Sequence, residues 1–270
     1  MPLVRSAVKT LLVHYVLQNG GFFIFYRLWG FPGFFLLLFL GVQTIFHLGV
    51  LLFLVKNRQL FYKINGGQRE TCVNAANKIT LFRITMLPFL IFLTLVSQRF
   101  HAGPVLAAAF ALTFASDFLD GWVARTRKLE TYIGRILDSA SDYLLLGALT
   151  GALFFFKLVT SWLFWLIMGR LLLNALVMFI LFLVHKKLRP QTTPLGKTAI
   201  AAIMVLLVME AAKPMGLPGW ISYIERAAAL VIGLSVIDKL VYLTKGLQDK
   251  APPERRAESP NGRFQGVKAE

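Results

Sequence analysis

Long apolar runs, each about the length that crosses a bilayer, dominate this chain. A first run covers residues 34–55, and a polar segment follows it at 56–77. Six further runs cover residues 78–96, 104–124, 134–156, 161–184, 196–212 and 219–243. Because about 20 apolar residues span the hydrocarbon core, the pattern predicts an all-α, polytopic membrane protein. No stretch alternates with the period of two that a membrane β-barrel requires.

The two ends of the chain are less apolar. Residues 1–32 mix apolar with basic side chains, and Gly20-Gly21 interrupts them, so we expect an interfacial amphipathic helix followed by a turn. The last residues carry many charges and three prolines without apolar periodicity, which predicts a disordered tail. The chain thus divides into an N-terminal segment with an extra hydrophobic helix (1–73), a six-helix membrane domain (74–245) and a tail (246–270).

Composition and charge agree with a membrane protein. The chain is 57% hydrophobic with a mean hydropathy of +0.65, and only 16% of its residues are charged. The net charge of +16 does not indicate nucleic-acid binding, because the basic residues gather in particular connections between spans, where they meet anionic lipid headgroups. The single Cys72 excludes an internal disulfide and a cysteine metal cluster.

Basic residues are concentrated in the connections on one side of the predicted bundle. They are frequent in 56–69, 125–128, 186–189 and 245–256, whereas the opposite connections carry only Arg99, Lys157 and Lys213. The positive-inside rule therefore assigns the rich connections to the cytoplasm. With this orientation, the extra first span leaves the N-terminus on the far side of the membrane, unless that run only dips into the bilayer.

An acidic constellation lies at the cytoplasmic ends of the second and third core spans. Residues 117–142 read DFLDGWVARTRKLETYIGRILDSASD. At about 100° per residue, each predicted helix carries one stripe of these residues. The stripes are Asp117, Asp120 and Ala124 on the first helix, and Gly134, Asp138 and Asp142 on the second. The short basic linker makes the two helices antiparallel neighbours, so we expect the stripes to face each other.

Four facing carboxylates at a bilayer edge need compensating positive charge. Divalent cations supply it, and Mg²⁺ or Mn²⁺ prefers oxygen ligands. Two such ions are a recurrent device for phosphoryl transfer, since they bind a diphosphate and neutralise developing charge. The plain alternative is ion pairing with nearby basic residues, namely Arg125, Arg127, Lys128 and Arg135. Acids inside a membrane are costly and usually functional, which favours the metal site.

These residues follow the pattern D-x2-D-G-x2-A-R-x8-G-x3-D-x3-D, and in this the chain resembles the CDP-alcohol phosphatidyltransferase family. The match holds at all eight fixed positions: Asp117, Asp120, Gly121, Ala124, Arg125, Gly134, Asp138 and Asp142. Eight specified residues at fixed spacing are a specific signal. The resemblance covers residues 74–245 and implies the six-helix family core, with the first 70 residues and the tail outside it.

The resemblance implies a reaction and a role for each motif residue. Family members typically break the pyrophosphate of CDP-diacylglycerol, release CMP and leave a new phosphodiester on an alcohol. Two Mg²⁺ or Mn²⁺ ions would be held by Asp117, Asp120, Asp138 and Asp142, and Asp142 would also act as general base. The CDP-lipid pocket would be lined by Asp117, Gly121, Ala124, Arg125 and Gly134. The glycines let a nucleotide approach the backbone, and the arginine fork suits phosphate oxygens.

The acceptor alcohol is less sharply indicated. The chain is similar to phosphatidylglycerophosphate synthase-like members in its opening NKITLFRITMLP and in Arg189 followed by Gly196-Lys197. Together with Arg170 inside the fourth core span, Arg189 and Lys197 suit the phosphate of glycerol 3-phosphate. However, Tyr143 and Met178 stand where those members commonly carry Lys and Arg. Phosphatidylglycerol, inositol or its phosphate, choline and serine therefore remain open as acceptors.

Two further expectations complete the sequence-based hypothesis. Arg83, within the first core span, is expected to snorkel or to stabilise a helix end rather than to bind substrate. The resemblance also implies a homodimer in the bacterial inner membrane or its equivalent, with the active site at the cytoplasmic face. A transporter or channel is the rival class, but such proteins usually show inverted repeats and midplane polar residues, and we find no repeat.

Overall fold

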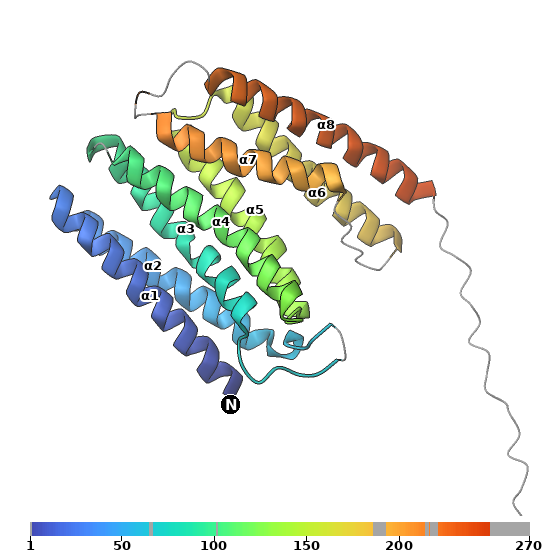
Figure 1. The fold of residues 1–270 in the computed structure, drawn as a ribbon, viewed down its shortest axis with the longest axis horizontal. Coiled ribbons are helices and arrows are strands. Elements are labelled where there is room, and N and C mark those ends of the chain that lie inside the picture. The colour runs from blue at the N-terminus through green and yellow to red at the C-terminus, as the bar shows by residue number, and fades with distance from the viewer. Residues whose placement is uncertain are drawn as a thin grey trace, which may run out of the picture.

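The protein is all-helical along the described chain. The computed structural model describes residues 2–64, 67–100, 102–185, 193–213, 216 and 221–248. Within these ranges, long helices lie side by side (Figure 1). They are α1 (Pro2–Trp29), α2 (Gly33–Lys56), α3 (Ala75–Phe100), α4 (Gly103–Thr126), α5 (Tyr132–Phe155), α6 (Ser161–His185), α7 (Pro194–Ala212) and α8 (Ile221–Gln248), with a short 3-10 helix at Arg58–Leu60.

The predicted apolar runs correspond to α2 through α8. Among the described helices, five are long and apolar enough to cross a membrane: α2, α3, α4, α7 and the Ile221–Thr244 part of α8. The α5 helix has 24 residues, which is also a spanning length, but it carries the charged part of the motif. Helix α6 has 25 residues, and its part Ser161–Val177 is an apolar stretch of the described residues. The all-helical, polytopic membrane architecture predicted from the sequence is confirmed.

The N-terminal helix differs from its prediction. Gly20-Gly21 does not interrupt it, and α1 continues to Trp29, ending at Gly30 with a φ of 60°. An internal glycine costs a helix only about 1 kcal/mol relative to alanine. The contacts of α1 with α2 and α3 compensate for that cost. The tail also begins later than predicted, because residues 246–248 belong to α8, and the rest of it lies outside the described residues.

Helix α3 is the centre of the bundle. It contacts α1, α2, α4 and α5, and most of its side chains are buried. Its apolar residues, with those of α1, α2 and α4 through α8, form the main hydrophobic core. Pro88 lies within the helix, where it removes one backbone donor without ending the helix, as neighbouring helices commonly allow in membrane proteins.

The segment between α2 and α3 folds back over the turn that joins α4 to α5. Lys63 forms an isolated β-bridge with Thr131, and the backbone N–H of Tyr132 donates to the carbonyl of Tyr62 at 3.1 Å. The rings of Tyr62 and Tyr132 stack with centroids 5.5 Å apart. The basic residues of the α2–α3 segment are therefore held at the same end of the bundle as the start of α5.

Candidate active site

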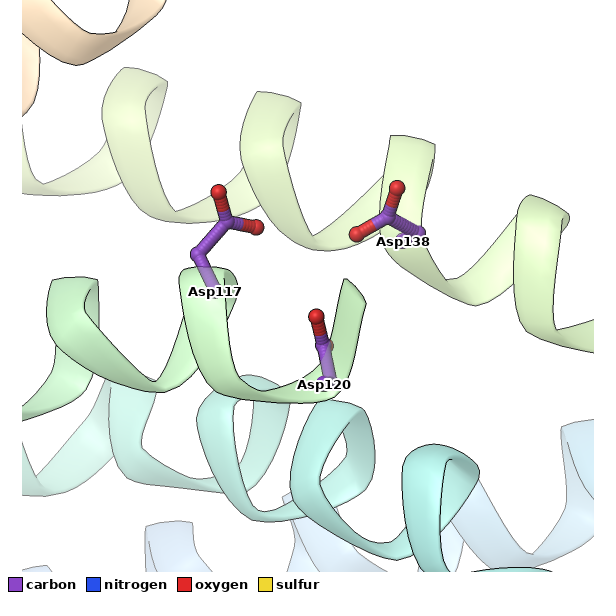
Figure 2. Close-up of side chains that lie close together, drawn as sticks. All are labelled: Asp117, Asp120 and Asp138. Carbon is purple, nitrogen blue, oxygen red and sulfur yellow. The ribbon is translucent and has the colours of Figure 1, made fainter. Parts of the chain in front are cut away.

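Aspartates from α4 and α5 meet at this end of the bundle. One carboxylate oxygen from each of Asp117, Asp120 and Asp138 lies within 4.8 Å of the others. Figure 2 shows the three side chains, two from one helix and one from its neighbour. Helices α4 and α5 both pack against α3 and α7 and face each other across a cavity of about 550 Å³. Three of the four motif aspartates therefore converge as the helical stripes predicted.

The fourth aspartate lines the same cavity but lies outside this trio. Asp142 follows Asp138 by one helical turn along α5. Its Oδ1 atom is buried and has no hydrogen-bond partner within the described part of the chain. A buried carboxylate oxygen without a donor is expensive unless a cation or a substrate hydroxyl reaches it. The oxygen-rich donor set and this orphaned atom both fit a site for hard divalent cations.

Arg83 is the residue that the sequence-based hypothesis placed wrongly. Its side chain is fully buried, so it does not snorkel to the membrane surface. Its guanidinium forms an ion pair with Asp117, lies 2.8 Å from Asp138 Oδ1 (Nη2) and 3.4 Å from Asp120 Oδ2 (Nη1). Its Nε donates to Ser141 Oγ at 3.0 Å. One arginine of α3 thus bridges the aspartates of both motif helices.

A signal for Arg83 was present in the sequence. A charged residue in the middle of an apolar run usually faces the bundle interior and has a partner there. Its neighbour Thr80, one turn earlier on α3, carries no such signal, yet its hydroxyl donates to Asp120 Oδ2 at 2.6 Å. The basic residues that follow Asp120 in the motif do not pair with the aspartates in the described structure. Arg135, for example, lies 3.4 Å from Glu130 instead.

Gly134 has a packing role that the motif alone does not indicate. A Cβ atom there would lie 2.5 Å from Asn77 Oδ1 and 2.9 Å from Thr131 Oγ1. Thr131 caps α5 by accepting from the Gly134 N–H at 3.1 Å, and the Asn77 amide donates to the same hydroxyl at 3.0 Å. The missing side chain therefore allows α3 to approach the first turn of α5 closely.

The remaining nucleotide-pocket candidates gather around the aspartates. The main cavity is lined by all of the predicted CDP-lipid residues: Asp117, Gly121, Ala124, Arg125 and Gly134. Arg125 is exposed at its edge, and its guanidinium lies over Gly121, where a Cβ atom would be 3.2 Å from Nη1. The structure thus brings these residues to one cavity together with the aspartates.

The acceptor candidates separate into three groups. Lys197 lines the main cavity, whereas Arg170 lines a smaller one behind Ile200, which borders both. Arg189 lies outside the described residues. The smaller cavity also contains a cation that the sequence-based hypothesis did not select, Lys239 of α8. The sequence of α8 contains two lysines, Lys239 and Lys245, and no motif in it singled out the first.

Arg170 and Lys239 are both almost fully buried, with 4% and 8% of their surface exposed. The guanidinium of Arg170 donates to Ser235 Oγ at 3.0 Å and to the Gly196 carbonyl at 2.8 Å, and its Nη1 has no partner among the residues that the structure describes. Within the described residues, neither cation forms an ion pair. Two buried positive charges beside the N-terminal turn of α7 favour an anion there.

Comparison with known proteins identifies the family. Residues 73–236, more than half of the chain, match the CDP-alcohol phosphatidyltransferase family. The chain therefore belongs to this family, as its motif suggested.

Curated relatives are similar to parts of the chain. Matches include proteins of Bacillus subtilis strain 168 (34% identity over 108 residues, 36% of this chain and 56% of that protein), Aquifex aeolicus strain VF5 (28% over 127 residues, 46% and 68%) and Rickettsia typhi (35% over 77 residues, 28% and 43%). Each is named CDP-diacylglycerol–glycerol-3-phosphate 3-phosphatidyltransferase. The chain spans about half the length of the curated relatives it matches.

Proposed function

We propose that this protein transfers a phosphatidyl group from CDP-diacylglycerol to an alcohol and releases CMP, with glycerol 3-phosphate as the acceptor. The observation that carries the proposal is the convergence of Asp117, Asp120 and Asp138 within 4.8 Å, at a cavity that Asp142 and Arg125 also line. Membership of the family supports the reaction class. The names of the curated relatives support the acceptor.

The four motif aspartates would hold two Mg²⁺ or Mn²⁺ ions. When bound, such ions supply positive charge to the diphosphate oxygens of the CDP-lipid. The protein's own contribution is to fix the carboxylates: Thr80 holds Asp120, and Arg83 holds Asp117 and Asp138. Preorganised ligands need no rearrangement when charge develops in the transition state.

Asp142 would act as the general base. The acceptor hydroxyl oxygen forms a bond to the phosphorus that bears diacylglycerol, and the bond from that phosphorus to the CMP oxygen breaks. The hydroxyl proton passes to a carboxylate oxygen of Asp142. The unpartnered Oδ1 supports this role, because it has no hydrogen bond to lose when it accepts the proton.

The small residues and the arginine at the cavity edge would bind the nucleotide. Gly121 and Ala124 leave room at the α4 backbone, and the exposed Arg125 offers a planar fork to phosphate oxygens. Leu129 and Thr131 line the same cavity at the turn into α5. The CDP moiety would therefore lie at the membrane-surface end of the cavity, with the diacylglycerol chains directed into the bilayer.

A phosphorylated acceptor suits the neighbouring cations. Lys197 faces the main cavity, and Arg170 and Lys239 line the smaller one next to it. Arg170 keeps one unpartnered nitrogen, so a phosphate oxygen could complete its hydrogen bonds. Uncharged acceptors such as inositol, or cationic ones such as choline, would leave these buried charges uncompensated.

The active site would face the cytoplasm. The basic α2–α3 segment touches the start of α5, so the aspartates lie at the end of the bundle with many basic residues, which supports a cytoplasmic orientation. A homodimer, as the family resemblance implies, completes the proposal.

A product assay tests the function. The purified protein in lipid nanodiscs would be given CDP-diacylglycerol and Mg²⁺ or Mn²⁺ with one acceptor at a time, and both CMP and the lipid product would be measured by mass spectrometry. We expect phosphatidylglycerol phosphate from glycerol 3-phosphate, and no product in EDTA. CMP release with another alcohol only would overturn the acceptor, and no CMP with any acceptor would overturn the reaction.

A further inference from the structure

The buried side of helix α1 mixes polar and apolar residues, whereas the exposed side of its middle part is apolar. Between Thr10 and Tyr26, every exposed residue is apolar or glycine. The large exposed side chains are Leu12, Val13, Val16, Leu17, Phe23 and Ile24, each with about half or more of its surface open. A helix that lies at a membrane surface has the opposite arrangement over its outer face, with charged residues toward water.

Two polar residues of α1, Tyr15 and Gln18, are hydrogen-bonded to neighbouring helices. The amide of Gln18 donates to Thr85 Oγ1 of α3 at 2.9 Å and accepts from Gln43 of α2. Tyr15 shares a hydrogen bond of 2.9 Å with Thr44 of α2. These bonds explain why polar side chains tolerate a site away from water, since buried polar groups need partners.

The length and ends of α1 match the hydrocarbon core. Lys9 and Arg27 are exposed, and no charged residue stands between them. The 17 residues from Thr10 to Tyr26 rise about 26 Å as an α-helix, and flanking Lys and Arg side chains reach further by snorkelling. The hydrocarbon core is about 30 Å thick. In Figure 1, α1 runs alongside α2, which is itself apolar enough to span.

We infer that α1 crosses the membrane, with its exposed apolar face against lipid acyl chains, so that α1 and α2 form an additional transmembrane hairpin. The inference goes beyond the proposed function and does not depend on it. The mean hydropathy of α1 is low because its buried polar residues are counted in the average. The bilayer would meet only the apolar face.

The hairpin also gives a consistent orientation. The backbone N–H of Val73, just before α3, donates to Ser6 Oγ at 3.1 Å, and Ala7 and Leu11 pack in one cluster with Ile133 of α5. The start of α1 therefore lies at the same end of the bundle as the aspartates. If α2 alone crossed the membrane, the residues before it would lie on the membrane face opposite to the aspartates. If α1 crosses as well, Arg5 and Lys9 lie on the same face as the aspartates and the basic connections.

Cysteine accessibility tests the topology. Native Cys72 is exposed in the α2–α3 segment and reports the side of the aspartate cluster. In a Cys72→Ser background, single cysteines would be introduced as Pro2→Cys, Leu17→Cys and Pro32→Cys. Cells and inverted membrane vesicles would then be treated with a membrane-impermeant maleimide, with wild-type Cys72 as reference.

We expect Pro2→Cys to react from the same side as Cys72, Pro32→Cys from the opposite side, and Leu17→Cys from neither. Labelling of Pro32→Cys from the Cys72 side, or of Leu17→Cys by the impermeant reagent, would overturn the spanning helix. A spin label at Leu17→Cys should be relaxed by oxygen and not by a water-soluble nickel complex. Efficient cross-linking of the Leu17→Cys protein to a second copy would show that this face of α1 contacts protein and not lipid.

Discussion

Charge balance around one buried arginine governs the site. The guanidinium of Arg83 has no contact with water, and three carboxylates surround it. Arg83 or the buried carboxylate of Asp120 alone would be costly at this depth, since each buried ion pays a desolvation cost of several kcal/mol. Together they compensate each other only in part, because one positive charge faces three negative ones. The remaining negative charge is what divalent cations would neutralise.

Removing the arginine should therefore make stability depend more strongly on metal. We expect Arg83→Gln to lower the free energy of unfolding by about 3–5 kcal/mol in EDTA, the usual effect of breaking a buried ion pair. Added Mn²⁺ should raise the melting temperature of the variant more than that of the wild type, because more carboxylate charge is left unpaired. Thermal unfolding in EDTA and in Mn²⁺ measures both effects.

A matched control is Arg99→Gln, which removes an exposed arginine from the other end of the same helix. It should leave both melting temperatures close to those of the wild type. Equal stabilisation of Arg83→Gln and wild type by Mn²⁺ would contradict the charge balance described for Arg83.

Asp142 can be tested with little change in shape. Asp142→Asn should reduce turnover by about 10²–10⁴-fold, the range expected for loss of a general base, while protein abundance and CDP-lipid binding remain. Asp238→Asn is the control, since Asp238 also has a buried oxygen with no hydrogen-bond partner in the described part of the chain but does not line the main cavity. Incorporation of labelled acceptor into lipid is the measurement. Near-normal turnover in Asp142→Asn would rule out the base.

Among helices, the approach of α3 to α5 sets the width of the site. Both helices contribute to the network around the aspartates, and Gly134 of α5 packs directly against Asn77 of α3. We expect Gly134→Ala to destabilise the protein by about 1–3 kcal/mol, because its Cβ would overlap Asn77 and force the helices apart. Thermal unfolding measures the loss.

Gly147→Ala provides the matched control on the same helix, since nothing lies within 4 Å of a Cβ there. It should be neutral or stabilising, as alanine is the better helix former. Adding Asn77→Ala to Gly134→Ala should recover part of the packing loss. A Gly134→Ala protein as stable as Gly147→Ala would show that the two helices can separate at little cost.

The two buried cations, Arg170 of α6 and Lys239 of α8, lie beside the start of α7. Lys239→Met should raise the KM for glycerol 3-phosphate about tenfold or more, with a smaller effect on kcat, because it removes one charge-assisted contact to phosphate. Arg226→Met is the control, since both cations lie over a tyrosine ring on α8 but Arg226 is exposed and outside the cavity. Steady-state kinetics distinguish them, and an unchanged KM would favour an uncharged acceptor.

Across the whole molecule, the two ends of the bundle carry separate charge clusters. Far from the aspartates, Lys213 Nζ lies 2.6 Å from both Glu210 Oε2 and Glu225 Oε1, joining α7 to α8. Its ammonium also reaches the Leu158 carbonyl at 3.5 Å, in the α5–α6 connection. This cluster ties together three elements at the end opposite to the site.

Lys213→Met should therefore destabilise the protein without altering substrate affinity. Glu210 is fully buried, so loss of its partner should cost about 3–5 kcal/mol, while the KM values stay unchanged because the cluster is remote from the cavity. Lys63→Met, which breaks the 3.8 Å pair with Glu70, should cost no more than about 1 kcal/mol. Thermal unfolding and kinetics of both variants are the measurements. A changed KM in Lys213→Met would contradict the independence of the Lys213 cluster from the substrate cavity.

The sequence by itself determined the fold class and the chemistry of the motif. Apolar length identifies spanning helices because a bilayer demands a minimum length, and helical periodicity places Asp117, Asp120 and Asp138 on facing stripes because spacing alone defines a helix face. Membership of the family rests on the match over residues 73–236, which contains those aspartates.

Only the tertiary structure decided which partners these residues have. Arg83 is separated from Asp117 by 34 positions and from Asp138 by 55, so no local pattern could pair them. The same holds for Gly134 against Asn77, for Lys239 beside Arg170, and for the polar face of α1, which is buried only because α2 and α3 fold against it. Periodicity specifies the face of a helix, whereas packing between distant segments specifies what that face meets.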